Sequence, residues 1–404
     1  MTSLPYNAQV WTVSAHDKVI KGLLQGQNAH PSPVAALLCV SRKEAAALLS
    51  VASLDSRDAV EQAARNLRAR VCKAVVITGG DDEDYADTLE ASGWLSLPAD
   101  RRMQPTADTS AVFVASAANA LAQGFVAIDA IILGCMAAAD GRRHRTTAGL
   151  PESSTGFAQY SENLPYFSLP QPAAVSGFAA LSHPDLGLYA VVDSATWVER
   201  VVAAGVRTVQ LRIKNAEHPE QREFVRQQVR HAIAAATEGG AQLFINDHWQ
   251  LAIEEGAYGV HLGQEDLHIA NLAAIRQAGL RLGISTHAYW EVCRAWALQP
   301  SYIACGPIHP TKAKAMPWIP QGNDNLAYWC KLLPVPVVGI AGMDVARTSE
   351  AAACGAAGVA LISAITAAPS PEAAILDLQQ ALRRGRSGPA IEAPLFPRPT
   401  LATT

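Results

Sequence analysis

Residues 244–266 read FINDHWQLAIEEGAYGVHLGQED, and they contain the unit from which the second half of the chain is built. A short apolar run ends at Asp247, an amphipathic stretch follows, and a second apolar run, GVHLG (259–263), leads to Asp266. Apolar runs that alternate with helix-like segments are typical of parallel β-strands joined by crossover helices. The unit therefore predicts two neighbouring parallel strands, each with a carboxylate near its C-terminal end.

The same unit recurs from Leu186 to about Leu382. The predicted strands are, in order, LYAVVDS (188–194), TVQLRI (208–213), QLFIND (242–247), GVHLG (259–263), RLGIST (281–286), YIACGP (302–307), PVVGIA (336–341) and GVALIS (358–363). The intervening segments predict amphipathic helices, such as EQREFVRQQVRHAIAAATEG and PEAAILDLQQALRR. Eight strand–helix repeats in about 200 residues predict an α/β fold of the (β/α)8 TIM barrel type over 186–385. An open doubly wound sheet is the rival, and it rarely needs eight parallel strands at such even spacing.

The rest of the chain predicts a smaller α/β domain, a linker and a tail. In residues 1–142 the runs LLCVS (37–41), AVVIT (74–78) and WLSLP (94–98) predict strands, while EAAALLSVA and TSAVFVASAANALAQG predict helices. Residues 143–185 are rich in Pro, Gly and Ser, which predicts a linker. Residues 386–404 have a similar composition, and we expect a disordered tail.

Composition narrows the class of protein. The chain has 404 residues, a formal net charge of −4 and no long basic run, so nucleic acid and anionic membranes are poor candidates as partners. Seven cysteines are scattered without a CxxC pair, which predicts free thiols in a reducing compartment. No segment is apolar over ~18 residues and the N-terminus lacks a signal-peptide pattern, so we expect a cytoplasmic protein.

Barrel enzymes place their sites at the C-terminal ends of the strands, and the second predicted strand is basic there. Gln210, Arg212 and Lys214 occupy alternate positions, which share one face of a strand. Any one of them could lie on a solvated outer edge, but three on one face favour a site for an anion or a pyrophosphate.

The next two strands end in Asn246-Asp247 and in Gly263-Gln264-Glu265-Asp266. An isolated Asp after a strand is more often a helix N-cap. Two carboxylates from neighbouring strands can also hold Mg²⁺, which prefers hard oxygen ligands. The basic residues one strand away favour the magnesium interpretation for Asp247 and Asp266.

The remaining strand ends predict a second phosphate site. Ser285 ends strand five, and the loop GPIHPTKAKAMPWIPQG after strand six carries Thr311, Lys312 and Lys314, which could close over phosphates or be a solvated basic loop. Strands seven and eight end in Gly339-Ile340-Ala341-Gly342 and Ile362-Ser363, where barrels commonly bind a monophosphate through backbone N–H groups. A pyrophosphate with Mg²⁺ beside a monophosphate favours a reaction that joins two substrates with loss of pyrophosphate.

Over about 186–385 the sequence resembles thiamine-phosphate synthases. The motifs in family order are QLRIK (210–214), FIND (244–247), GVHLGQED (259–266), GISTH (283–287), GPIHPTKAK (306–314), PQG (320–322), VGIAGM (338–343) and ISAI (362–365). The resemblance implies that hydroxymethylpyrimidine diphosphate and hydroxyethylthiazole phosphate are joined through a pyrimidine-methyl cation. No general base is then needed, and His261 and His287 are expected to have structural or supporting roles.

The resemblance also implies a role for each site residue. Mg²⁺ would be held by Asp247 and Asp266, and the pyrimidine by Gln210 and Asn246. The diphosphate would be bound by four residues, which form the catalytic set: Arg212, Lys214, Ser285 and Lys314. The thiazole phosphate would be bound by Thr311, Gly342, Ile362 and Ser363. The chain departs from the family at Ala313, usually threonine, and at Ala341, usually glycine; one lost hydroxyl would weaken phosphate binding by ~1–3 kcal/mol.

Residues 1–142 faintly resemble the C-terminal part of hydroxymethylpyrimidine phosphate kinases of the ribokinase-like fold. The similar pieces are SRKEAAALL (41–49), VVITGG (75–80) and TADTSAVFVASAANALAQG (106–124). The glycine-rich anion hole expected before the last helix is replaced around Asp108-Thr109-Ser110-Ala111, which predicts a truncated, degenerate domain without kinase activity, used for packing, assembly or regulation.

Alternatives to the synthase remain open. A thiazole phosphate tautomerase would lack the diphosphate-binding set, and a non-catalytic sensor of thiamine phosphate would gain little from two metal carboxylates. Oligomeric state is also open, with a homo-oligomer among the options.

Overall fold

The computed structural model describes residues 10–25, 35–79, 83–97, 110–144, 155–168, 177–214, 219–311 and 317–402. Its contacts divide the chain into two compact units. Unit 1 comprises residues 1–172, 288–297 and 401–404, and unit 2 comprises residues 173–287 and 298–400. Among the described helices, none is long and apolar enough to cross a bilayer.

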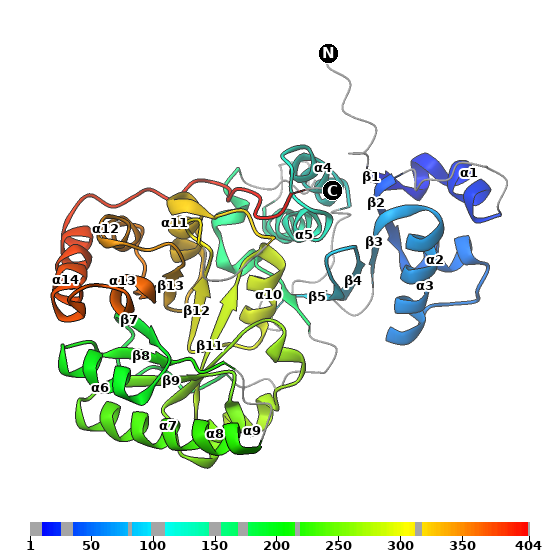
Figure 1. Cartoon of the computed structure of the whole chain (residues 1–404). Coiled ribbons are helices and arrows are strands. Elements are labelled where there is room, and N and C mark those ends of the chain that lie inside the picture. Colours follow the sequence, from blue (N-terminus) through cyan, green and yellow to red (C-terminus); the bar gives the residue numbers. More distant parts are fainter. Residues whose placement is uncertain are drawn as a thin grey trace. The chain divides into compact units, whose positions relative to one another are not determined.

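Unit 2 is a closed barrel of parallel strands, as the sequence predicts (Figure 1). The strands are β7 (Gly187–Val192), β8 (Thr208–Leu211), β9 (Gln242–Asn246), β10 (Gly259–Leu262), β11 (Arg281–Thr286), β12 (Tyr302–Cys305), β13 (Val337–Ile340) and β14 (Gly358–Leu361). They pair in chain order, and β14 closes on β7 through the pair Val359–Leu188. Their Val, Leu and Ile residues are buried on both faces, as expected for a parallel sheet covered by helices.

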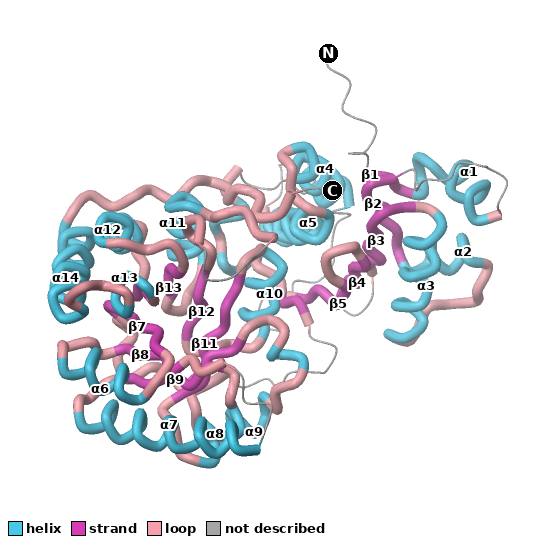
Figure 2. Tube along the Cα trace, in the orientation of Figure 1, coloured by secondary structure: helices cyan, strands magenta, loops and turns pink. Residues whose placement is uncertain are grey.

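Helices alternate with the barrel strands along the chain (Figure 2). Those of unit 2 are α6 (Ala195–Ala203), α7 (Pro219–Glu238), α8 (Trp249–Glu254), α9 (Leu272–Gln277), α11 (Gly322–Leu332), α12 (Val345–Ala353), α13 (Ser363–Thr366) and α14 (Pro371–Ser387). A buried cluster fills the barrel interior and includes Tyr189, Phe244, Tyr302 and Val338. The interior is therefore a packed core, which leaves the strand ends for a site.

The C-terminal tail is described to Ala402, where the composition predicted disorder. The Asn325 amide on α11 donates to the Arg398 carbonyl over 2.9 Å, and the Arg398 N–H donates back to Asn325 over 2.6 Å. The Ile319 N–H donates to the Thr400 carbonyl over 2.8 Å. These backbone contacts give the proline-rich tail partners that its composition alone does not reveal.

Unit 1 contains a six-stranded mixed sheet in the order β1-β2-β3-β4-β5-β6. The strands are β1 (Val10–Thr12), β2 (Ala35–Ser41), β3 (Cys72–Thr78), β4 (Glu83–Asp87), β5 (Ser92–Ser96) and β6 (Tyr166–Phe167). The first three are parallel, and β3 to β6 pair antiparallel. β6 lies within the segment expected to be a linker, so this segment completes the sheet of unit 1.

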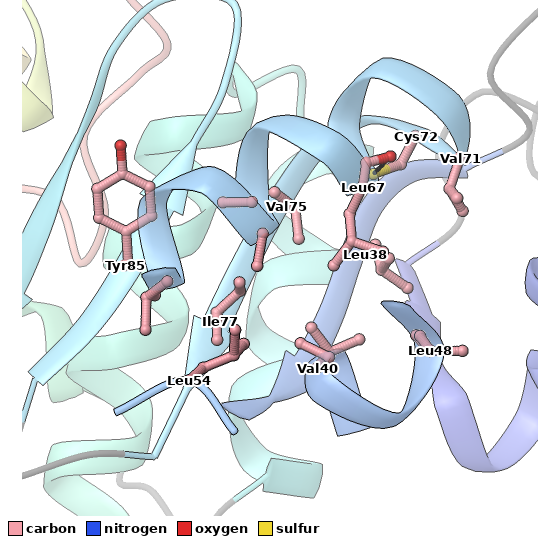
Figure 3. Close-up of a cluster of buried hydrophobic side chains, with 14 of the residues drawn as sticks. Leu38, Val40, Leu48, Leu54, Leu67, Val71, Cys72, Val75, Ile77 and Tyr85 are labelled. Atoms are coloured by element: carbon pink, nitrogen blue, oxygen red, sulfur yellow. Dashed lines mark hydrogen bonds between the residues drawn. The ribbon is translucent and has the colours of Figure 1, made fainter. Parts of the chain in front are cut away.

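Helices cover both faces of the three parallel strands in unit 1. They are α1 (Val13–Leu24), α2 (Arg42–Leu49), α3 (Arg57–Arg70), α4 (Ser110–Ala122) and α5 (Ala127–Arg143). Figure 1 shows α2 and α3 on one face of β2 and β3, and α4 and α5 on the other. In Figure 3, Leu38 and Val40 of β2 and Val75 and Ile77 of β3 lie in one apolar cluster with residues of α2 and α3.

One further helix belongs to unit 1 although barrel strands flank it in the chain. α10 (Tyr289–Ala297) follows β11 and precedes β12, and Tyr289–Trp296 are all buried. Its Arg294 guanidinium lies 5.2 Å from the centre of the Phe167 ring on β6. The chain thus passes from unit 2 to unit 1 after His287 and returns at Leu298. The expected barrel boundaries of 186–385 did not anticipate this exchange.

Candidate active site at the strand ends

The polar residues singled out in the sequence follow consecutive strands of the closed barrel. Gln210 lies on β8, Asn246 ends β9, His261 lies on β10 and Ser285 lies on β11, four neighbours in the barrel order. Asn246 pairs with His261, Ser285 lies two residues beyond Gly283, the next partner of His261, and Gln210 pairs with Phe244, two residues before Asn246. The barrel register therefore gathers them at one end.

The two candidate metal ligands lie directly beyond β9 and β10. The carboxyl groups of Asp247 and Asp266 are within hydrogen-bond reach of each other. The Asp247 N–H donates to the His261 carbonyl over 3.1 Å, and Asp266 Oδ2 accepts the Gly263 N–H over 3.0 Å. Asp247 has a φ of 62°, a left-handed conformation that aspartate tolerates better than most residues. The backbone thus bends sharply at the point where the two carboxyl groups meet.

Electrostatics at this pair disfavour two negative charges. Although Asp247 is accessible at the barrel surface, its carboxyl loses hydration between Asp266 and Asn246. This desolvation and the Asp266 carboxylate raise the pKa of Asp247 to about 6, while Arg212 and Asn246 act in the opposite direction. A cation would relieve the repulsion between the two carboxylates.

The basic residues lie at and beyond the end of β8. The strand ends at Leu211, so Gln210 lies within it and Arg212 and Lys214 follow it. The Arg212 N–H still donates to the Val192 carbonyl over 2.7 Å, which extends the ladder by one residue. Lys214 is exposed in the loop that follows. Both cations remain at the same end of the barrel as the carboxylate pair.

Ser285 is held from two sides. Its Oγ lies 2.8 Å from His261 Nε2, and its carbonyl accepts a hydrogen bond from the Gln264 amide over 2.8 Å. His261 is buried, and its Nδ1 lies 2.8 Å from the Tyr302 hydroxyl. The expectation of a supporting role for His261 agrees with these contacts.

The predicted monophosphate residues follow β12, β13 and β14 on the other side of the barrel. Gly342 has a φ of 68°, and a Cβ there would lie 2.7 Å from the Pro310 carbonyl oxygen, next to Thr311. Ile362 follows β14, and Ser363 begins α13. Close approach of the two loops at Gly342 thus requires a residue without a side chain. Lys312, Ala313 and Lys314 lie outside the described residues.

Two interior tyrosines belong to the same network and were not predicted. The Gln210 amide donates to the Tyr189 hydroxyl over 3.2 Å, and the Tyr189 and Tyr302 hydroxyl oxygens are 2.7 Å apart. The available signal was a tyrosine at an inward position of β7 and of β12, where aliphatic residues are usual.

The barrel half of the chain is similar in sequence to known proteins. A sequence model of the family described as thiamine monophosphate synthase matches residues 188–365. The thiamine-phosphate synthase of Yersinia pestis strain Pestoides F is 53% identical over 196 residues, which make up 48% of this chain and 89% of the relative. That of Neisseria meningitidis strain Z2491 is 49% identical over 203 residues, 50% of this chain and 97% of the relative.

A similar solved structure is the thiamine phosphate pyrophosphorylase from Pyrococcus furiosus. It is 25% identical, with a TM-score of 0.45, over 50% of this chain and 98% of that one.

Proposed function

The chain belongs to the thiamine-phosphate synthase family, a family of transferases, and we propose that its barrel joins hydroxymethylpyrimidine diphosphate to hydroxyethylthiazole phosphate with release of pyrophosphate. The observation that carries the proposal is the position of the Asp247–Asp266 carboxylate pair beside Arg212, at the ends of three consecutive strands. The cations and the carboxylate pair provide for a diphosphate and its metal ion. β12 to β14 provide for the second, singly phosphorylated substrate.

The residues present fit a magnesium ion. Burial and the neighbouring Asp266 carboxylate raise the pKa of Asp247, and all donor atoms are carboxylate oxygens, which Mg²⁺ prefers. In the described part of the chain no group of three or more His, Cys, Asp or Glu side chains could hold a metal. Two protein carboxylates, with water and substrate phosphates as further ligands, are the usual magnesium arrangement.

Each end of the pyrimidine substrate has candidate partners. Gln210 and Asn246 would bind the pyrimidine ring, and Arg212, Lys214, Ser285 and Lys314 would bind the diphosphate. Thr311, Gly342, Ile362 and Ser363 would bind the thiazole phosphate, where Gly342 allows backbone to approach closely.

The reaction needs charge stabilisation more than proton transfer. The C–O bond to the diphosphate breaks first, the electron pair leaves with pyrophosphate, and the thiazole nitrogen captures the pyrimidine-methyl cation. Arg212, Lys214 and the Ser285 hydroxyl would stabilise the negative charge that grows on the leaving group. Magnesium, when bound, supplies further neutralisation of this charge. The attacking nitrogen carries no proton, so no general base is required.

The direct test is formation of thiamine phosphate from the two purified substrates, with and without Mg²⁺. We expect Mg²⁺-dependent product from the full chain. Failure of the intact protein to form product would exclude the synthase, and tautomerisation of a thiazole phosphate or metal-independent binding of thiamine phosphate would identify the two alternatives.

For the N-terminal region we propose a degenerate relative of hydroxymethylpyrimidine phosphate kinases that serves packing and no longer phosphorylates. Its mixed sheet begins with three parallel strands, and α10, which follows β11 in the chain, belongs to its core. Asp108 and Thr109 lie outside the described residues, whereas Ser110 and Ala111 begin α4. ATP-dependent phosphorylation of hydroxymethylpyrimidine by the full chain would refute the proposal.

We also propose a cytoplasmic location. All seven cysteines are free, and burial raises the pKa of the thiols of Cys72 and Cys305 to about 12. Free, unreactive thiols are typical of proteins in reducing compartments.

A further inference from the structure

Five hydrogen-bonded side chains, here called the relay, cross the barrel interior and connect two residues of the proposed site. The Gln210 amide nitrogen lies 3.2 Å from the Tyr189 hydroxyl, which lies 2.7 Å from the Tyr302 hydroxyl. Tyr302 then lies 2.8 Å from His261 Nδ1, and His261 Nε2 lies 2.8 Å from Ser285 Oγ. The members come from β8, β7, β12, β10 and β11, so the relay spans the barrel.

The hydrogen bonds of the relay can all be donated in one direction, from Gln210 toward Ser285. The Gln210 amide donates to Tyr189, so the Tyr189 hydroxyl hydrogen is directed to its other partner, the Tyr302 oxygen. Tyr302 then directs its own hydrogen to His261 Nδ1. Burial raises the pKa of both tyrosines, so each keeps the hydrogen that this direction requires.

The histidine transmits the direction to the serine. The buried His261 ring lies between two hydroxyl groups, with Tyr302 at Nδ1 and Ser285 at Nε2. With Nδ1 accepting from Tyr302, the hydrogen is on Nε2 and is donated to Ser285 Oγ. The hydrogen of the Ser285 hydroxyl is then free to be donated elsewhere.

We propose that Tyr189, Tyr302 and His261 are positioning residues that fix Gln210 as a hydrogen-bond acceptor and Ser285 as a hydrogen-bond donor toward the pyrimidine diphosphate. The inference rests on the proposed function. An exocyclic amine of the pyrimidine donates hydrogen bonds, and the free Gln210 Oε1 accepts them. Diphosphate oxygens only accept, and the free Ser285 O–H donates. Gln210 and Ser285, at the two ends of the relay, therefore match the two ends of one substrate.

Packing holds the central member in place. The Tyr302 ring lies 5.0 Å from Phe244 and 5.7 Å from the stacked His261 ring, measured between ring centroids. A Cβ on Gly283 would collide with the Tyr302 ring and hydroxyl, so the glycine makes room for the tyrosine. A fixed Tyr302 hydroxyl can impose one tautomer on His261.

The test is Tyr302→Phe in the full chain, with Tyr258→Phe as the matched control. Tyr258 packs against the same Phe244, with 5.6 Å between ring centroids, but its hydroxyl bonds with Gln242 and Ser182, outside the relay. We expect Tyr302→Phe to raise KM for the pyrimidine diphosphate by about 10- to 100-fold, as for a lost hydrogen bond to a charged group. In Tyr302→Phe, KM for the thiazole phosphate should change by no more than about twofold. In Tyr258→Phe, KM for either substrate should also change by no more than about twofold.

A second readout does not depend on activity. In ¹H–¹⁵N spectra of the wild-type imidazoles, His261 should be the neutral Nε2–H tautomer, and Tyr302→Phe should give a mixture of tautomers. A wild-type Nδ1–H tautomer, or equal KM changes in Tyr302→Phe and Tyr258→Phe, would overturn the inference.

The two proposals fail in different ways. If the wild type makes no thiamine phosphate, the proposed function fails, whatever the tautomer of His261. If the wild type is active and its His261 carries the hydrogen on Nδ1, the synthase stands and the relay falls. Should Tyr302→Phe not fold, Ser285→Ala offers a second variant. It should leave the wild-type tautomer in place while raising KM for the diphosphate substrate, and loss of the Nε2–H tautomer would count against the relay.

Discussion

The Asp129 carboxylate on α5 accepts a hydrogen bond from the Trp290 backbone N–H on α10 over 3.0 Å. The Trp290 N–H is in the first turn of its helix, where N–H groups have no partner within the helix. Asp129 supplies that partner from another helix, and the Tyr289 N–H also contributes. Because Asp129 is 2% exposed, this contact is shielded from water. It ties α10 to the N-terminal sheet domain.

The Asp129 contact predicts a pH dependence of stability. Burial raises the pKa of Asp129 from 3.8 to about 7. The folded chain therefore holds this proton more tightly than the unfolded chain. The contribution of this group to the free energy of unfolding is fully present below pH 3.8 and falls as the pH rises to about 7. Asp129→Asn keeps an acceptor and removes the charge, so its stability relative to wild type should rise over this interval and then level off.

Urea unfolding of wild type, Asp129→Asn and Asp129→Ala between pH 5 and 8.5 would check this. Asp129→Ala leaves a buried N–H without a partner and should cost about 1–3 kcal/mol. Asp58→Asn, in the exposed first turn of α3, is the control and should run parallel to wild type. If the difference in the free energy of unfolding between wild type and Asp129→Asn stays constant with pH, the raised pKa of Asp129 is contradicted.

Removing either candidate metal ligand should weaken magnesium activation. Asp247→Asn and Asp266→Asn keep size and hydrogen bonding but remove a charge, so we expect an increased Mg²⁺ requirement and a loss of kcat/KM by about 100-fold or more. The exposed Asp193 follows β7 at the same end of the barrel, and Asp193→Asn is the matched control. Mg²⁺ titration of initial rates distinguishes them, and equal Mg²⁺ curves for all variants would place the metal elsewhere.

The barrel could be predicted because each of its strands is locally visible. The runs of buried Val, Ile and Leu stand between amphipathic helices at even spacing, and all eight predicted strands occur in the structure. The ends were less certain: TVQLRI predicted a strand to Ile213, but β8 ends at Leu211. The carboxylate pair was found because parallel strand ends meet at one edge.

What could not be predicted depends on contacts between distant segments. α10 has the sequence pattern of any barrel helix, and only its contacts with β6 and α5 assign it to unit 1. β6 is two residues long and lies in a proline-rich segment, so it has no periodicity to detect. The relay through Tyr189 and Tyr302 depends on side chains that meet across the barrel, which sequence spacing does not encode.

The order of the tail is predicted to depend on Asn325. The fully buried Asn325 side chain forms two hydrogen bonds with the Arg398 backbone, so Asn325→Ala should release the tail and destabilise unit 2 by about 1–3 kcal/mol. Hydrogen exchange should accelerate at the Ile319 amide, which donates to the Thr400 carbonyl.

Arg398→Ala is the matched control for the tail. It removes the exposed guanidinium, which reaches the Gln321 carbonyl over 3.2 Å and Asp324 over 3.7 Å, but keeps both backbone bonds to Asn325. Exposed ion pairs contribute about 0–1 kcal/mol, so this variant should exchange almost as slowly as wild type. Equally fast exchange in both variants would show that the Arg398 guanidinium, and not the hydrogen bonds of the Arg398 backbone to Asn325, holds the tail.

The backbone of Ala341 is in a conformation that favours glycine. Its φ of 82° lies in the left-handed region, which costs an alanine about 1–2 kcal/mol. Ala341→Gly relieves this strain but adds freedom to the unfolded chain, worth about 0.4–1 kcal/mol. The balance predicts that Ala341→Gly raises the free energy of unfolding by about 0.5–1 kcal/mol.

The matched control for Ala341→Gly is Ala278→Gly, at a helix end where φ is −73°. There is no strain to relieve at this position, so the substitution should lower the free energy of unfolding by about 0.4–1 kcal/mol. Thermal and urea unfolding of both variants should therefore give shifts of opposite sign. If both glycines destabilise the chain equally, the left-handed conformation of Ala341 carries no cost.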